Sequence, residues 1–270
     1  MITLILISGL LDSTSMGVPR PVDIYVDDSN RIFVLSINGK IWLYEDLNDT
    51  PKIFLRGLSQ PAMEMELWGD TIFVMHGRYL DAIYGSERKR IVGFIPLLNG
   101  NNTFALDTMN RYIYLALEGF WHYKYPGKVF RLSIDGKNMY TYATGLKNPI
   151  AMKVDSAGIP WIISQVRDDS TFGLHPLYEG LNYSNLEPEI YFSTTPTDLE
   201  ISGENFIISF VDGALVLYKE IQDDVYEREE LLNTPYEISS IFLKGDTIYF
   251  TDYVSGRVYR SLLKFLEANK

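Results

Sequence analysis

The sequence predicts an all-β fold: a six-bladed β-propeller of four-stranded antiparallel blades, with residues 1–270 forming a single domain. Three observations predict it. A motif recurs about every 40 to 48 residues, its copies consist of alternating β-branched and aromatic segments, and helical periodicity is almost absent. Repeated groups of short strands are typical of propellers. Two packed sheets in Greek-key order are the alternative, but they would not produce a regular four-strand repeat.

Each copy of the motif supplies the same elements in the same order. A short alternating strand comes first, and the copies begin at Pro21, Pro61, Phe104, Pro149, Pro196 and Pro235. A polar turn and a β-branched, aromatic strand follow, as at residues 32–35, 71–74, 113–115 and 247–250. Third strands are expected at 40–44, 128–132, 214–218 and 257–261, and fourth strands at 52–58 and 139–146. Four strands in each of six copies give the predicted architecture.

The last copy lacks a fourth strand, because the chain ends in the short amphipathic segment LLKFLEANK. Residues 2–10, ITLILISGL, end like the fourth strands KIFLRGL and YTYATGL. We therefore expect residues 2–10 to pair into the last blade and close the ring, which would hide the sheet edges of an open one. This segment has no positively charged start, so it makes a poor secretory signal, and its apolar run is too short to span a membrane.

Composition excludes several classes of function. The 270 residues include no cysteine, so disulfides and thiolate metal sites are absent. A formal net charge of -11 argues against nucleic acid or anionic lipid as a partner, since both require clustered Lys and Arg. The missing export signal favours the cytoplasm slightly. Oligomeric state and compartment are not determined by the sequence.

Long loops on a compact scaffold are where binding sites are usually found. We expect tight turns between the second and third strands of blades one, five and six, and long loops at the corresponding places of blades two, three and four: residues 75–90, 118–128 and 165–180. Each of these three loops contains one of the three histidines, His76, His122 and His175. They could form one shared site, or they could be ordinary loop residues, and no pair has the close spacing of metal ligands.

Other side chains of these loops extend the predicted binding face. The aromatic residues Tyr79, Trp121 and Tyr123 could form the wall of a pocket, and Arg167 adds a positive charge. Asp168 and Asp169 could ligate calcium, although adjacent aspartates also occur in solvated turns.

The order of motifs from about residue 104 to 261 resembles the soluble quinoprotein glucose and sorbosone dehydrogenases, which are six-bladed propellers that use pyrroloquinoline quinone (PQQ) and calcium. The resemblance rests on GKVFRLSIDGK, ATGLKNPIAMKVDSAGIPWI, EGLNYSNL and GDTIYFTDYVSGRVYR, at residues 127–137, 143–162, 179–186 and 245–260. It implies cofactor contacts at Lys147, Asn182 and Tyr183.

The chain also departs from that family at positions its chemistry needs. Asn99 occupies the position that matches the catalytic histidine, and an amide cannot act as a general base. Lys147 replaces an arginine and lacks its planar bidentate fork. The entry to the last blade, residues 236–242, has no counterpart of the family's other cofactor arginine.

Two classes of function follow. The first is a non-catalytic propeller that binds a protein or glycan partner through the long loops of blades two to four. The alternative is an enzyme: a divergent sugar dehydrogenase dependent on PQQ and calcium, or a metal-dependent hydrolase of the lactonase type. For a lactonase, the carboxylates near first strands would be candidate ligands: Glu64, Glu66, Asp198, Glu200 and Glu237.

Overall fold

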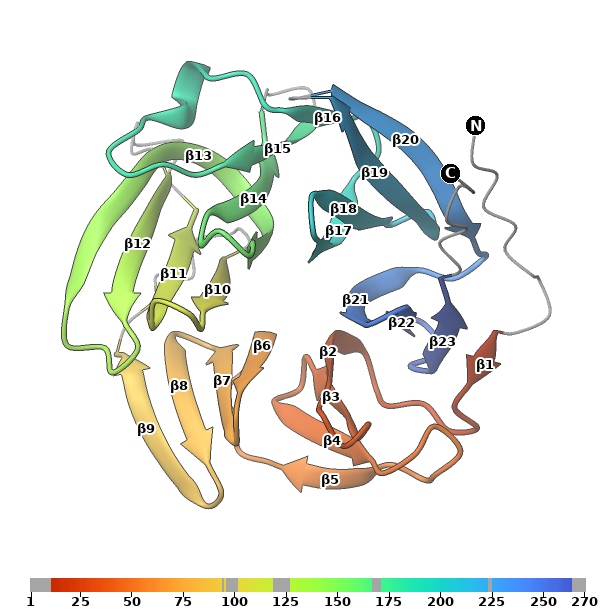
Figure 1. Ribbon diagram of the computed structural model, residues 1–270. Coiled ribbons are helices and arrows are strands. Elements are labelled where there is room, and N and C mark those ends of the chain that lie inside the picture. The colour runs from red at the N-terminus through yellow and green to blue at the C-terminus, as the bar shows by residue number, and fades with distance from the viewer. Residues whose placement is uncertain are drawn as a thin grey trace.

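The computed structural model describes residues 11–93, 95, 102–118, 127–166, 171–222 and 225–263. Its strands form a ring of antiparallel sheets (Figure 1). This arrangement confirms the predicted all-β propeller of four-stranded antiparallel sheets. Within the described ranges the only helical turn is η2 (Tyr183–Asn185), so no helix there is long and apolar enough to cross a membrane.

Strand pairing in the described ranges gives four four-stranded sheets and one seven-stranded sheet. The long middle strand of the seven-stranded sheet serves two groups of four, so we name the groups blades one to six, and the first strand of each lies innermost (Figure 1). Blade one contains β2 (Pro21–Val26), β3 (Ile32–Ser36), β4 (Lys40–Tyr44) and β5 (Lys52–Leu55). Blade two contains β6 (Ala62–Trp68), β7 (Thr71–His76), β8 (Tyr79–Tyr84) and β9 (Glu87–Val92). Blade five contains β17 (Pro196–Ser202), β18 (Asn205–Phe210), β19 (Ala214–Gln222) and β20 (Val225–Asn233).

Blades three and four share one long strand. Blade three begins with β10 (Thr103–Asp107), β11 (Tyr112–Leu117) and β12 (Gly127–Ser133), and the strand that follows is β13 (Met139–Val154). The first half of β13 pairs with β12 and its second half pairs with β14 (Pro160–Gln165), so it ends one blade and begins the next. Blade four is completed by β15 (Phe172–Pro176) and β16 (Ile190–Phe192).

Blade six joins the two ends of the described chain. It contains β21 (Ile238–Lys244), β22 (Thr247–Asp252) and β23 (Val258–Leu262), with β1 (Asp12–Ser13) at its edge. Asp12 pairs with Arg260 and Ser13 with Tyr259. The predicted closing strand at residues 2–10 lies outside the described residues, but the segment directly after it does pair with the last sheet.

The core lies between neighbouring blades. One buried cluster packs blade four against blade five through residues such as Ile163, Leu174 and Ile208. Another packs blade five against blade six through Leu215, Leu217 and Phe250. Alternation along each strand directs apolar side chains to both faces of every blade, because each face meets another blade.

Two of the predicted long loops are strands instead. Residues 79–84 and 87–92 are the third and fourth strands of blade two, so the prediction of one loop over residues 75–90 was wrong. Within the predicted loop at residues 165–180, Phe172–Pro176 forms β15. Residues 87–92, ERKRIV, begin with four charged residues and show no alternation, so only their pairing with β8 identifies them as a strand.

Candidate functional site

A repeated irregularity shapes the centre of the ring. In five first strands the register with the second strand slips by one residue near the start, which is the signature of a β-bulge. In β2, for example, Pro21 pairs with Ser36 and Asp23 with Leu35, which leaves Val22 unpaired. The corresponding residues of the other blades are Met63, Ile150, Thr197 and Ser239.

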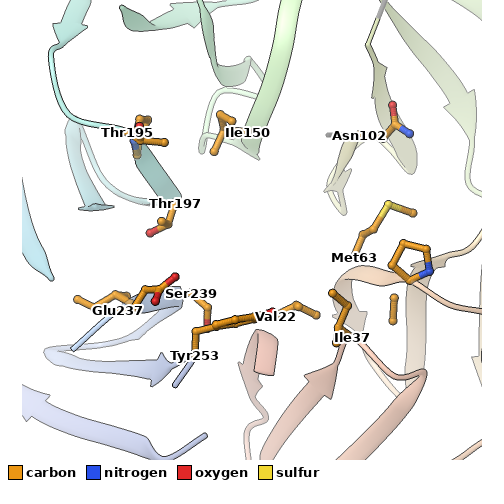
Figure 2. A pocket seen from close by; sticks show the side chains of 14 residues that line it. Val22, Ile37, Met63, Asn102, Ile150, Thr195, Thr197, Glu237, Ser239 and Tyr253 are labelled. Carbon is orange, nitrogen blue, oxygen red and sulfur yellow. The ribbon is translucent and has the colours of Figure 1, made fainter. Parts of the chain in front are cut away.

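The bulged residues line a pocket at the end of the ring where the first strands begin (Figure 2). The pocket has a volume of about 520 Å³, and every blade contributes to its wall. Blade three supplies Asn102, and blade six adds Glu237 and Tyr253. A bulge turns a side chain away from the regular alternation of its strand. The repeated bulge therefore builds this pocket, which we call the mouth pocket.

The lining of the mouth pocket combines apolar side chains with small hydroxyl and amide groups. Thr197 Oγ1 lies 2.8 Å from Ser209 Oγ, and Ser239 Oγ lies 2.8 Å from Thr251 Oγ1, so neighbouring strands fix both hydroxyls. Asn102 Oδ1 accepts the Glu118 N–H at 3.1 Å. Among the described lining residues Glu237 is the only charged one. Such a lining suits an uncharged polar molecule.

Beneath the mouth pocket, carboxylates link the first strands of neighbouring blades. Asp23 Oδ2 accepts the Met65 N–H at 2.6 Å, and Asp198 Oδ2 accepts the Ile241 N–H at 2.9 Å. From blade two, Glu64 Oε2 accepts the Phe104 N–H at 2.7 Å, and Glu66 Oε2 accepts the Leu106 N–H at 2.9 Å. Each bond satisfies a backbone donor of the next blade's innermost strand. The carboxylates therefore hold the ring together.

One lysine counters this acidic group. Lys153 Nζ lies 3.3 Å from Glu66 Oε1 and 3.3 Å from Glu200 Oε1. Burial alone would lower the pKa of Lys153, but the surrounding carboxylates outweigh it and raise that pKa well above its usual value. Burial raises the pKa of Glu200 to about 8, even though Lys153 acts in the opposite direction.

Two aspartates compete for one hydroxyl. Ser240 Oγ lies 2.8 Å from Asp23 Oδ1 and 2.7 Å from Asp198 Oδ2. A hydroxyl carries a single hydrogen, so it can donate to only one carboxylate, and the other carboxyl must itself carry a proton to bond to Oγ. Burial and the charge of Asp198 raise the pKa of Asp23 to about 7, which agrees with this geometry.

Four of the five carboxylates proposed as lactonase ligands, Glu64, Glu66, Asp198 and Glu200, belong to this ring, and Glu237 lies at the mouth pocket. Oxygens of Glu64, Glu66 and Asp198 accept backbone N–H groups, and oxygens of Glu66 and Glu200 lie 3.3 Å from Lys153 Nζ. No group of three or more His, Asp or Glu side chains in the described ranges is arranged to hold a metal ion. Sequence reasoning missed Asp23, Lys153 and Ser240. The signal for Asp23 and Ser240 was a polar side chain just past the start of a first strand, whereas Lys153 lies near the end of one.

His76 and His175, for which a shared site was one of two alternatives, are each buried in strands. His76 Nδ1 accepts the Ser59 N–H at 2.9 Å, so its hydrogen is on Nε2, which lies 2.9 Å from Asp81 Oδ2. Burial lowers the pKa of His76. Arg88 and Arg90 also bond to Asp81, and Arg90 lies over the Tyr79 ring at 3.5 Å. This group ties β7, β8 and β9 together.

His175 lies beside the residues that the resemblance assigned to the cofactor. Lys147, His175 and Tyr183 line one cavity of about 10 Å³, which is too small for any cofactor. Asn182 Oδ1 accepts the Ser184 N–H at 3.0 Å, and Tyr183 Oη donates to the Pro176 carbonyl at 2.7 Å. These contacts hold the segment after β15 against blade four. Outside the described residues lie Asn99, Trp121, His122, Tyr123, Arg167, Asp168 and Asp169.

No family model and no curated protein matches the sequence. Solved structures do match in fold. The PQQ-bound aldose sugar dehydrogenase of Streptomyces coelicolor superposes with a TM-score of 0.77 at 12% identity, over 93% of this chain and 96% of that one. A putative glucose dehydrogenase of Thermus thermophilus gives 0.79 at 12% identity, over 94% and 99%.

The same ring also occurs in a protein with another activity. The virginiamycin B lyase of Staphylococcus aureus superposes with a TM-score of 0.61 at 11% identity, over 94% of this chain and 99% of that one. Sequence identities this low establish the fold alone, so the chemistry has to be argued from the residues of the site. The chain is a β-propeller whose fold resembles that of the soluble PQQ-dependent glucose and sorbosone dehydrogenases.

Proposed function

We propose that this protein binds a sugar in the mouth pocket. The observation that carries the proposal is the lining: Thr197, Ser239 and Asn102 offer neutral hydrogen-bonding groups, and Tyr253 offers an aromatic ring. A volume of about 520 Å³ falls in the range of ligand pockets. The dehydrogenases of similar fold are named for sugar substrates, which supports a carbohydrate as the ligand.

Oxidation of that sugar with PQQ and calcium is the second candidate, and the structural comparisons favour it. PQQ is a tricarboxylate, so its site needs cations. The described lining of the mouth pocket has no Lys, Arg or His, and a group of carboxylates lies below it. Lys147 lines the small cavity beside His175 instead. The described residues therefore do not fit PQQ, and we derive no catalytic step through it.

Thermal unfolding separates the two candidates. A ligand at a hundred times its dissociation constant adds about 2.7 kcal/mol of stability, which is a readily measured rise in the midpoint. We expect a neutral aldose to raise the midpoint without PQQ, and the rise to be lost in Thr197→Val and Tyr253→Leu. Leu262→Ala, which changes the exposed last residue of β23, is the control and should keep the rise.

Titration with PQQ and calcium gives the opposing result. A rise that requires both PQQ and calcium, followed by dye-linked oxidation of an aldose, would establish the dehydrogenase instead. If neither sugars nor PQQ with calcium move the midpoint, the sugar-binding proposal is wrong.

A further inference from the structure

A second cavity lies at the opposite end of the ring, between blades four and five. Its volume is about 590 Å³. The turn after β13 contributes Asp155, the turn after β17 contributes Glu204, and blade five adds Lys219, Glu220 and Tyr226. These turns follow the ends of the first strands, whereas the mouth pocket lies at their beginnings. The two cavities are therefore separate, and nothing in the proposed sugar site accounts for the second.

The outer hairpin of blade five is extended to form a wall of this cavity. Strands β19 and β20 have nine residues each, and β18 has six. Pairing between β18 and β19 ends at Phe206 with Tyr218, whereas β19 and β20 continue to pair to Gln222 and Val225. The extension brings Lys219, Glu220 and Tyr226 to the cavity.

Aromatic rings form the inner surface of the cavity. The Trp161 and Phe206 ring centroids are 4.6 Å apart, and those of Phe206 and Tyr226 are 5.6 Å apart. Trp161 Nε1 donates to Asp155 Oδ2 at 2.9 Å. Donation to a carboxylate draws electron density into the indole, which strengthens the attraction of its face for a cation. Trp161 and Tyr226 are only partly buried, so a ligand can reach them.

Charge selects the ligand. Three carboxylates line the cavity, those of Asp155, Glu204 and Glu220, against one ammonium group, that of Lys219. Lys219 is also directly opposite Glu227 in the β19–β20 pair, so its charge is countered locally. We propose that this cavity binds a small organic ammonium ion, which the aromatic rings contact through cation–π interactions and the carboxylates hold by charge.

Choline and its neutral carbon analogue 3,3-dimethylbutan-1-ol form a matched pair of probes, because they differ mainly in the charge. We expect isothermal titration to show that the 270-residue chain binds choline at least tenfold more tightly than the neutral analogue. Glu204→Gln and Tyr226→Leu should each weaken choline binding several-fold. The matched controls, Glu45→Gln and Tyr84→Leu, remove an exposed carboxylate and an exposed tyrosine of blades one and two, and should leave binding unchanged.

Other outcomes would overturn the proposal. Equal affinity for both probes would show that charge plays no part. If a lysine-rich peptide bound to the cavity and choline did not, the ligand would be a macromolecule. If glucose bound and Tyr226→Leu abolished its binding, the cavity would be a second sugar site. Thr197→Val tests whether the second cavity acts independently of the mouth pocket, and choline binding should be unchanged in this variant. If Tyr226→Leu fails to fold, Glu204→Gln on its exposed turn still decides the result.

Discussion

Ser240 Oγ lies 2.8 Å from Asp23 Oδ1 and so joins the innermost strand of the last blade to that of the first. The two residues are 217 positions apart in the chain. Because the same hydroxyl also contacts Asp198 of blade five, three blades meet at one hydroxyl group. Ring closure is thereby coupled to the protonation of buried carboxyls, and the stability of the protein should depend on pH.

Stability should fall as the pH rises from 7 to 9. The pKa of Glu200 is raised to about 8, and that of Asp23 to about 7, mainly by burial. A raised pKa means that the folded state binds a proton that the unfolded state has already released, so stability is lost as the pH rises through the folded value. Glu200 alone should cost about 1.4 kcal/mol over this range.

Chemical denaturation at pH 7 and pH 9 measures this loss. In Glu200→Gln the carboxyl cannot ionise, so the loss should shrink by about that amount. Glu204→Gln removes an exposed carboxylate of the same blade and should leave the pH dependence unchanged. A wild-type protein equally stable at both pH values would contradict the buried protonated carboxyls.

Replacing Glu64 should loosen the contact between blades two and three. Its carboxylate accepts the Phe104 N–H and the Thr103 hydroxyl, both of which are buried. Glu64→Ala leaves both donors unpaired and should cost about 2 kcal/mol of unfolding free energy. Glu64→Gln keeps an acceptor oxygen at the same place and should cost clearly less. Equal losses in the two variants would mean that packing, not hydrogen bonding, is the contribution of Glu64.

His175 should weaken the protein in mild acid. Burial lowers its pKa to about 4, whereas an unfolded histidine titrates near 6.5. As the pH falls from 7 to 5 the unfolded state gains a proton that the folded state does not bind, which costs roughly 2 kcal/mol. The buried carboxyls change stability in the opposite direction over this range. The measurement is therefore the difference in pH dependence between the wild type and His175→Gln, and no difference would refute a neutral His175.

Asp81 should be critical for blade two. It is fully buried and bonds to His76, Arg88 and Arg90. Asp81→Asn removes the charge that both guanidinium groups face and should cost about 3 kcal/mol in urea denaturation. Asp70→Asn, on an exposed turn of the same blade, should cost little. Sugar binding in the mouth pocket should persist in Asp81→Asn where it remains folded, since Asp81 does not line that pocket.

The sequence predicted the strands well where β-branched and aromatic residues were concentrated. Residues 32–35 and 247–250 lie in β3 and β22, as their β-branched and aromatic composition indicated. It failed at residues 75–90, which were predicted to form one loop, whereas Arg88 and Arg90 lie in an outer strand and pair with a buried aspartate. A cluster of charged residues does not by itself indicate a loop, because its charges can pair with a buried side chain of a neighbouring strand.

The candidate site was predicted only in part. Glu64, Glu66, Asp198 and Glu200 were recognised as first-strand carboxylates, and the structure places all four at the centre of the ring. The bulges that expose Val22, Met63, Ile150, Thr197 and Ser239 were not predicted, because a bulge is a slip in register between two strands. Register depends on the partner strand, and one strand's pattern does not contain it.

The sequence by itself determined the repeat, the strand order and the all-β class, since these depend on residues close together in the chain. The tertiary structure decided which side chains meet: His76 with Asp81 instead of with His175, and Asp23 with Ser240 across the closure of the ring. The physical reason is burial. Whether a carboxyl holds a proton, or a histidine stays neutral, depends on the groups that surround it after folding, and those come from blades far apart in the chain.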